Sequence, residues 1–227
     1  MPTVFFLKKY FTKATMPLLF VFLIGSLFFA GSLSGAQKIG VARTFYFLAT
    51  DSLHIQTSVH NAQALGGAGY LLQEKDRDYV VFSAYLTEEE CWNAETQLLL
   101  DVGNTVVIEQ RCGNLYLKNG EKKYANYYAG AFDTLYNLLG ILNGEIKRLS
   151  NGGTQEDCKR VLEILRKQFA YLAENTPSIF PEYAVVCQNA EKELNAITQG
   201  VVYGEDLRYL LCSLCVSYID LTHNFVL

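Results

Sequence analysis

The stretch that most constrains the fold of this chain is residues 66–91, with the sequence GGAGYLLQEKDRDYVVFSAYLTEEEC. It begins with glycines, which tolerate the backbone conformations found at helix ends and turns. Two apolar runs flank the polar, mostly charged residues 73–78, and this pattern predicts a β-hairpin. Thr87 and Glu90 then form a capping-box pattern, with acidic side chains where a helix dipole favours them. The order of strand, hairpin, strand and helix is typical of a small α+β module.

The segments on either side extend this module. Residues 44–50 (TFYFLAT) and 105–110 (TVVIEQ) have strand composition, whereas residues 54–65 and 88–102 repeat their apolar residues at helical spacing. The order strand–helix–strand–strand–helix–strand predicts a four-stranded antiparallel sheet with both helices on one face. Strict alternation along the strands places four residues under the helices: Phe45, Phe47, Val80 and Phe82. The opposite face would present Tyr46, Leu48, Tyr79, Val81 and Ser83.

Two parts of this module carry a resemblance to a known family. They are the aromatic-rich first strand, Phe45-Tyr46-Phe47, and residues 79–91, YVVFSAYLTEEEC. With these segments, residues 44–112 resemble a SPOR domain, the sporulation-related repeat that binds peptidoglycan. The resemblance implies binding of glycan strands stripped of their stem peptides, on the sheet face opposite the helices.

The glycan-binding candidates that follow from the resemblance are Tyr46, Leu48, Tyr79, Val81 and Ser83. The family tends to carry polar residues such as glutamine and arginine on this face, and the chain has Leu48 and Val81 there instead. Tyr46 and Tyr79 offer flat rings and hydroxyl groups that suit sugar binding. The same two tyrosines could instead pack against another part of the protein, and the sequence leaves both interpretations open.

The amino-terminal segment has a pattern of its own. Residues 14–36 contain no charged side chain and follow Lys8, Lys9 and Lys13. A run of this length predicts a single transmembrane helix, and the lysines place residues 1–13 in the cytoplasm. We therefore expect a single-pass protein of the bacterial cytoplasmic membrane with an extracytoplasmic body. The alternative is a signal peptide that is cleaved after Ala36, where small residues form a possible cleavage site.

Beyond the module, the apolar pattern becomes helical. Residues 112–123 are a polar connector, and residues 122–227 predict a bundle of about four helices. The first ends near Ser150, the second begins after Thr154, and the others cover residues 182–198 and 205–222. Short connections favour antiparallel neighbours. This bundle could bind a protein partner, although no motif in it specifies one.

Few residues could support catalysis or metal binding. Cys212 and Cys215 form a C-x-x-C, but they lie among leucines without a second ligand pair, which favours buried thiols. The three histidines are isolated, and Glu88, Glu89 and Glu90 fit a solvated first helical turn. No nucleophile–base pair is recognisable. We expect a non-enzymatic protein without a metal or a cofactor.

Net charge bears on the class of ligand. The chain carries 19 basic and 23 acidic side chains, a balance of −4, and three of the basic ones precede residue 14. This balance argues against a nucleic-acid partner. The sequence therefore predicts a membrane-anchored protein that binds peptidoglycan glycan in sporulation or cell division. The alternative is an extracytoplasmic protein–protein scaffold whose sheet face packs on the bundle or on a partner; an enzyme carried by the bundle is a third interpretation.

Overall fold

The computed structural model describes residues 36–51, 55–102, 104–118 and 120–223, without the side chains of residues 98–102. Its main sheet contains β2 (Thr44–Asp51), β3 (Tyr70–Glu74), β4 (Arg77–Tyr85) and β5 (Val106–Arg111). The strands lie in the order β3-β4-β2-β5, and each neighbouring pair is antiparallel. The hairpin between β3 and β4 turns at Lys75 and Asp76, which both adopt positive φ.

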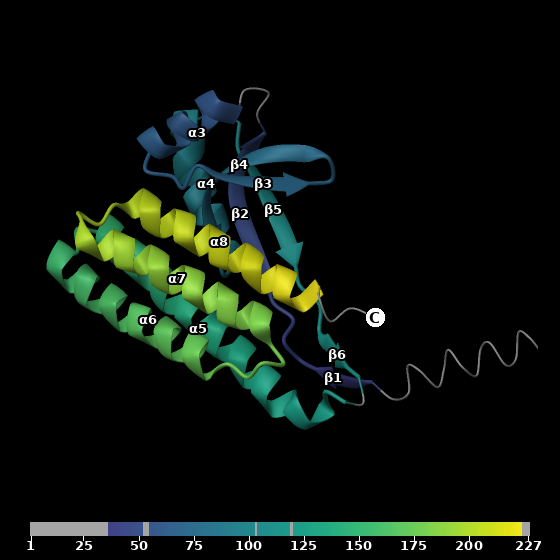
Figure 1. Cartoon of the computed structure of the whole chain (residues 1–227). Helices are drawn as coiled ribbons and strands as arrows, with labels where there is room; N and C mark the ends of the chain where they lie inside the picture. The colour runs from purple at the N-terminus through teal and green to yellow at the C-terminus, as the bar shows by residue number, and fades with distance from the viewer. Residues whose placement is uncertain (1–35, 52–54, 103, 119, 224–227) are drawn as a thin grey trace, which may run out of the picture.

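Helices cover both faces of this sheet (Figure 1). On one face lie α3 (Ile55–Ala64) and α4 (Glu88–Val102). The short 3-10 helix η1 (Lys122–Tyr124) precedes a bundle on the other face, made of α5 (Ala125–Ser150), α6 (Gln155–Asn175), α7 (Pro181–Gln199) and α8 (Gly204–His223). Within the bundle, α8 contacts β4 directly and also packs against α5 and α7, whereas α6 packs mainly on α7. The sheet is therefore the middle of three layers.

The bundle and the sheet share one hydrophobic core. Phe45 of β2 packs its ring at 5.3 Å, centroid to centroid, from that of Tyr218 in α8, and at 6.3 Å from that of Tyr136 in α5. The ring of Phe132 lies 5.0 Å from Tyr218 on the bundle side of the same core. Tilted and edge-to-face ring pairs of this kind bury large apolar areas in a defined geometry. The contact is too extensive for the sheet face to be free.

A β-bulge explains why strict alternation assigned the sheet faces wrongly. Leu48 pairs with Ser83, but Ala49 pairs with Val81, so Phe82 is the extra residue on β4. Val81 consequently joins Phe45 and Phe47 in the core shared with the bundle, while Val80 and Phe82 pack with Ala62 of α3. The prediction that one set of helices covers Phe45, Phe47, Val80 and Phe82 is wrong. These residues are divided between the two faces.

The predicted fold class is also wrong about the number of sheets. Residues 112–123 were expected to be a polar connector, and no strand was predicted in residues 37–43. Parts of them form β1 (Gln37–Ile39) and β6 (Leu115–Leu117), which pair as a separate two-stranded sheet. Ile39, Leu115 and Leu117 are buried there in the common core. The arrangement is two small sheets with helices on both sides of the larger one, in place of one open sheet followed by a bundle.

The prediction of a transmembrane helix is corrected as well. Among the helices that the structure describes, none combines the length and the apolar character that a bilayer crossing requires. The proposed span at residues 14–36 lies, apart from Ala36, outside the described residues, as do residues 1–13. The structure therefore gives no support to a single-pass membrane protein with an extracytoplasmic body.

Helices elsewhere match the sequence pattern closely. The capping pattern at Thr154 is confirmed, because its hydroxyl accepts a hydrogen bond from the Asp157 backbone N–H at 3.2 Å at the start of α6. Pro181 opens α7 at a position where proline is favoured. The predicted range of residues 88–102 coincides with α4.

Candidate functional site

The five predicted glycan-binding residues do not form one surface. Val81, 0% exposed, and the half-buried Tyr79 pack in the core shared with the bundle. Leu48 and Ser83, 1% and 4% exposed, are cross-strand partners on the face covered by α4. Tyr46 pairs with Tyr85 on that face and remains partly exposed. The structure thus brings Leu48 and Ser83 together and separates them from Tyr79 and Val81.

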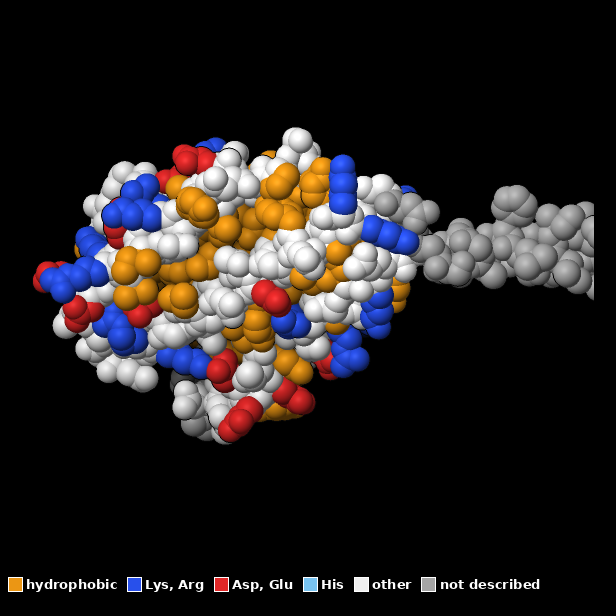
Figure 2. Space-filling view, turned by 90° about the horizontal axis from the view of Figure 1, so that it is seen from below, with side chains coloured by type: hydrophobic (Ala, Val, Ile, Leu, Met, Phe, Trp, Pro, Cys, Tyr) orange, Lys and Arg blue, Asp and Glu red, His pale blue; other side chains and the backbone are white. Residues whose placement is uncertain are grey.

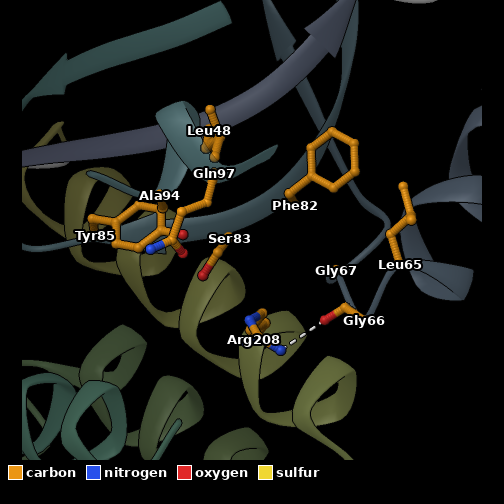
Figure 3. A pocket seen from close by; sticks show the side chains of 10 residues that line it. All are labelled: Leu48, Leu65, Gly66, Gly67, Phe82, Ser83, Tyr85, Ala94, Gln97 and Arg208. Atoms are coloured by element: carbon orange, nitrogen blue, oxygen red, sulfur yellow. Dashed lines mark hydrogen bonds between the residues drawn. The ribbon is translucent and has the colours of Figure 1, made fainter. Parts of the chain in front are cut away.

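Leu48 and Ser83 line a cleft where α4, β4 and α8 meet. The cleft consists of two open recesses of about 190 and 330 Å³, which share the residues Ser83, Tyr85, Ala94, Gln97 and Arg208. In Figure 3, Tyr85, Ser83 and Gln97 lie on one side of the first recess, and Phe82 and Leu65 lie on the other. An apolar wall therefore faces a wall of hydroxyl, amide and guanidinium groups. Such a combination is typical of sites for small polar ligands.

Two glycines shape the loop that borders the first recess. Gly66 adopts φ +77°, a conformation that residues with a Cβ rarely use. At Gly67 a Cβ would lie only 2.8 Å from Cδ1 of Phe82 and 2.9 Å from the carbonyl oxygen of Ala62. The absence of side chains lets this loop lie against β4, where the Ala68 N–H donates to the Phe82 carbonyl at 2.7 Å. The loop then presents the Gly66 carbonyl to the cleft.

Arg208 connects this loop to the bundle. Its Nη1 donates to the Gly66 carbonyl at 2.7 Å, and its Nη2 donates to Oγ of Ser150 at 3.0 Å. Both acceptors are neutral. Within the described part of the chain, no carboxylate lies within ion-pair distance of Arg208. The guanidinium is a half-buried positive charge that lines both recesses.

The second recess contains a paired set of charges. Glu90 of α4 accepts a hydrogen bond from Nδ2 of Asn143 at 3.0 Å and forms an ion pair with Lys147, both from α5. The interpretation of Glu90 as part of a solvated helical turn is therefore incomplete, since its carboxylate joins α4 to the bundle. Lys147 is neutralised by this contact, which leaves Arg208 as the cation of the cleft lining without a counter-charge among the described residues.

Tyr85 contributes a protonated hydroxyl. Burial raises the pKa of Tyr85 to about 12, and the nearby positive charge of Arg208 opposes that rise only in part. At neutral pH the phenol is therefore uncharged and able to donate a hydrogen bond. The cleft at this pH offers hydrogen-bond donors and acceptors around one net positive charge.

The cysteines lie elsewhere and are poorly suited to chemistry. The burial predicted for Cys212 and Cys215 is confirmed, and all six cysteines are buried without a disulfide. Burial raises the pKa of Cys91 and that of Cys187 to about 12, and it also raises the pKa of Cys212 and that of Cys215. These thiols stay protonated, whereas a nucleophilic cysteine acts as a thiolate. Over the described residues, no cluster of three His, Cys, Asp or Glu side chains could hold a metal ion.

Sequence reasoning missed most of the cleft. Arg208 stands between Leu207 and Leu210 in the apolar pattern of α8, and it is the one lysine or arginine of that helix, which was an available signal. Gln97 and Tyr85 gave no signal, because amides and tyrosines are common on helix surfaces and in strands.

The fold and the cleft define an α+β protein with an open polar site between a sheet module and a helical bundle. The chain matches no protein-family model, no curated protein and no solved structure. Its function must therefore be argued from its own geometry.

Proposed function

We propose that this chain is a non-catalytic glycan-binding protein and that the cleft between α4, β4 and α8 is its binding site. The observation that carries the proposal is the lining: Tyr85, Ser83, Gln97 and Arg208 surround a space whose far wall is Phe82. A sugar ring offers apolar C–H faces and a rim of hydroxyls, so it needs both kinds of wall. Peptidoglycan glycan is the ligand that the SPOR resemblance suggests.

The size of the site favours a short segment of glycan. Pockets that bury a drug-sized ligand measure roughly 300–1,000 Å³. The two recesses, at about 190 and 330 Å³, suit one sugar ring each and are open to solvent for the rest of a chain. The sheet face that the resemblance indicates is less suitable, because α8 and α5 cover Phe45 and Val81.

A pull-down of the purified full-length protein with peptidoglycan sacculi tests the proposal. The Tyr85→Phe/Gln97→Ala double variant removes one hydroxyl and one amide from the cleft and should lose most of the binding. Thr96→Ala is the matched control. Thr96 is exposed on the same helix, and its hydroxyl donates a hydrogen bond to the backbone carbonyl of Trp92, one turn earlier in α4. Equal retention of wild type and double variant on sacculi would exclude the cleft as the glycan site.

A second candidate function is a protein–protein scaffold, favoured by apolar side chains on the outer bundle. Ile164 and Tyr171, seven residues apart on α6, are 60% and 62% exposed, and Val185 on α7 is 52% exposed. Figure 2 shows hydrophobic side chains gathered on the face of the molecule seen from below. Exposed apolar patches commonly mark protein interfaces. Photo-crosslinking from position 171, with loss of one defined product in an Ile164→Glu variant, would support this candidate.

A further inference from the structure

We infer that Arg208 makes the cleft selective for a carboxylate-bearing saccharide over its neutral counterpart. This inference rests on the proposed glycan-binding function and specifies its ligand. It starts from an electrostatic imbalance in the cleft. The lining contains two cations and one carboxylate, and Glu90 is already paired with Lys147.

Arg208 has binding capacity left over. A guanidinium carries five N–H donors and stays protonated at all physiological pH values. The contacts to Gly66 and Ser150 use one donor on each of its two terminal nitrogens. Donors therefore remain for a ligand, and a charge held partly out of water gains most from an ionic partner.

The planar shape of the Arg208 guanidinium and its single positive charge both favour a carboxylate as the ligand group. A planar carboxylate can accept two parallel hydrogen bonds from a guanidinium. A single uncompensated cation also balances a monoanion, whereas a phosphate monoester near pH 7 carries close to two negative charges. The extra charge would lie in a cleft that already contains the Glu90 carboxylate. Ser83 and the protonated Tyr85 line the same recess as Arg208, where their hydroxyls can contact the neutral part of the ligand.

Gly204 controls where the guanidinium lies. It precedes Arg208 by one helical turn, and a Cβ at this position would lie 2.8 Å from Nη1 of Arg208. The flexible end of the arginine would have to move away from such a methyl group. Gly204→Ala therefore displaces the charge without removing it, and it complements Arg208→Gln, which removes the charge and keeps a polar side chain.

The experiment compares N-acetylmuramic acid with N-acetylglucosamine, which lacks the lactyl carboxylate, by titration calorimetry on the full-length protein. We expect the acidic sugar to bind roughly tenfold more tightly or better, as a charge-assisted contact would give. Arg208→Gln should abolish this preference, so that the variant binds the two sugars with equal affinity, and Gly204→Ala should reduce the preference. Circular dichroism melts verify that both variants are folded.

Equal affinity of the wild type for the two sugars would overturn the inference, as would a preference that survives in a folded Arg208→Gln variant. Inorganic phosphate that competes as strongly as D-lactate would overturn the choice of carboxylate. Two further results separate this inference from the function on which it rests. If the Arg208→Gln variant binds sacculi as well as the wild type does, the inference is refuted and the proposed glycan binding stands. If the wild type binds D-lactate at Arg208 but does not bind sacculi, glycan binding is refuted and the carboxylate site stands.

Discussion

The hydroxyl of Tyr218, near the end of α8, donates a 2.9 Å hydrogen bond to the backbone carbonyl of Val41, just before β2. The two residues are 177 positions apart in the chain. Tyr218 is fully buried, and its ring also packs against Phe45 and Phe132. This residue therefore joins the last helix, the main sheet and the interior of the bundle.

Removal of this contact should destabilise the whole protein. Tyr218→Phe keeps the ring and leaves the Val41 carbonyl with only the long 3.8 Å contact from Sγ of Cys112, at a cost of about 1–3 kcal/mol. Tyr218→Ala also leaves a cavity, and the cost should rise to about 3–5 kcal/mol. Thermal melts followed by circular dichroism should show one transition that shifts downward. Two separate transitions, of which only one moves, would contradict a shared core.

Two glycine substitutions should have opposite effects. Gly67→Ala forces a methyl group into Phe82 and the Ala62 backbone, so stability and the shape of the cleft should both suffer. Gly140 lies in the interior of α5 with no atom near the position of a Cβ, so Gly140→Ala should stabilise the protein by about 0.5–1 kcal/mol. Chemical denaturation of both variants measures the difference. A destabilised Gly140→Ala protein would argue against the placement of α5.

Stability should fall in strongly alkaline solution. The pKa of Tyr85 is raised from 10.0 to about 12 in the folded protein, so the unfolded chain releases this proton at lower pH. The sign follows from linkage: the stabilising contribution is complete below pH 10 and is lost as the pH rises towards 12. Tyr70 and Tyr128 act in the same direction. Chemical denaturation at several pH values should show that the free energy of unfolding falls less steeply with rising pH in Tyr85→Phe than in the wild type. Equal slopes in the two proteins would refute the raised pKa of Tyr85.

The C-x-x-C pair should behave as core packing. Cys212 and Cys215 are buried in α8 with raised thiol pKa values, so a thiol reagent should label them only in the unfolded protein. Replacing both by alanine should cost on the order of 1 kcal/mol per site. Metal analysis serves as the control: stoichiometric zinc in the wild type that disappears in the double variant would contradict a packing role.

The elements with the strongest periodicity could be predicted from the sequence, and the contacts between them could not. The capping residues Thr87 and Thr154 fixed the starts of α4 and α6 within one residue. The strands β1 and β6 went unrecognised because three residues are too few for an alternating pattern.

The bulge at Phe82 was hidden for a different reason. Residues 80–84 are all buried, since helices cover both faces of β4, and such a strand shows no alternation from which a register shift could be read. The cleft depends on that shift and on Arg208 reaching Gly66 across 142 positions. Neither relation leaves a local pattern in the sequence.

The bond between Val41 and Tyr218 has a consequence for the order of synthesis. On the ribosome, β2 to β5 emerge before the helix that covers their second face, and a domain generally folds as one unit. Until α8 is complete, Phe45, Phe47 and Val81 have no cover from it on that side of the sheet. A nascent chain that stops before residue 204 therefore exposes apolar side chains on this face of the sheet to the extent that α8 would cover them. The twenty residues of α8 must therefore be synthesised before the shared core can form on this side of the sheet.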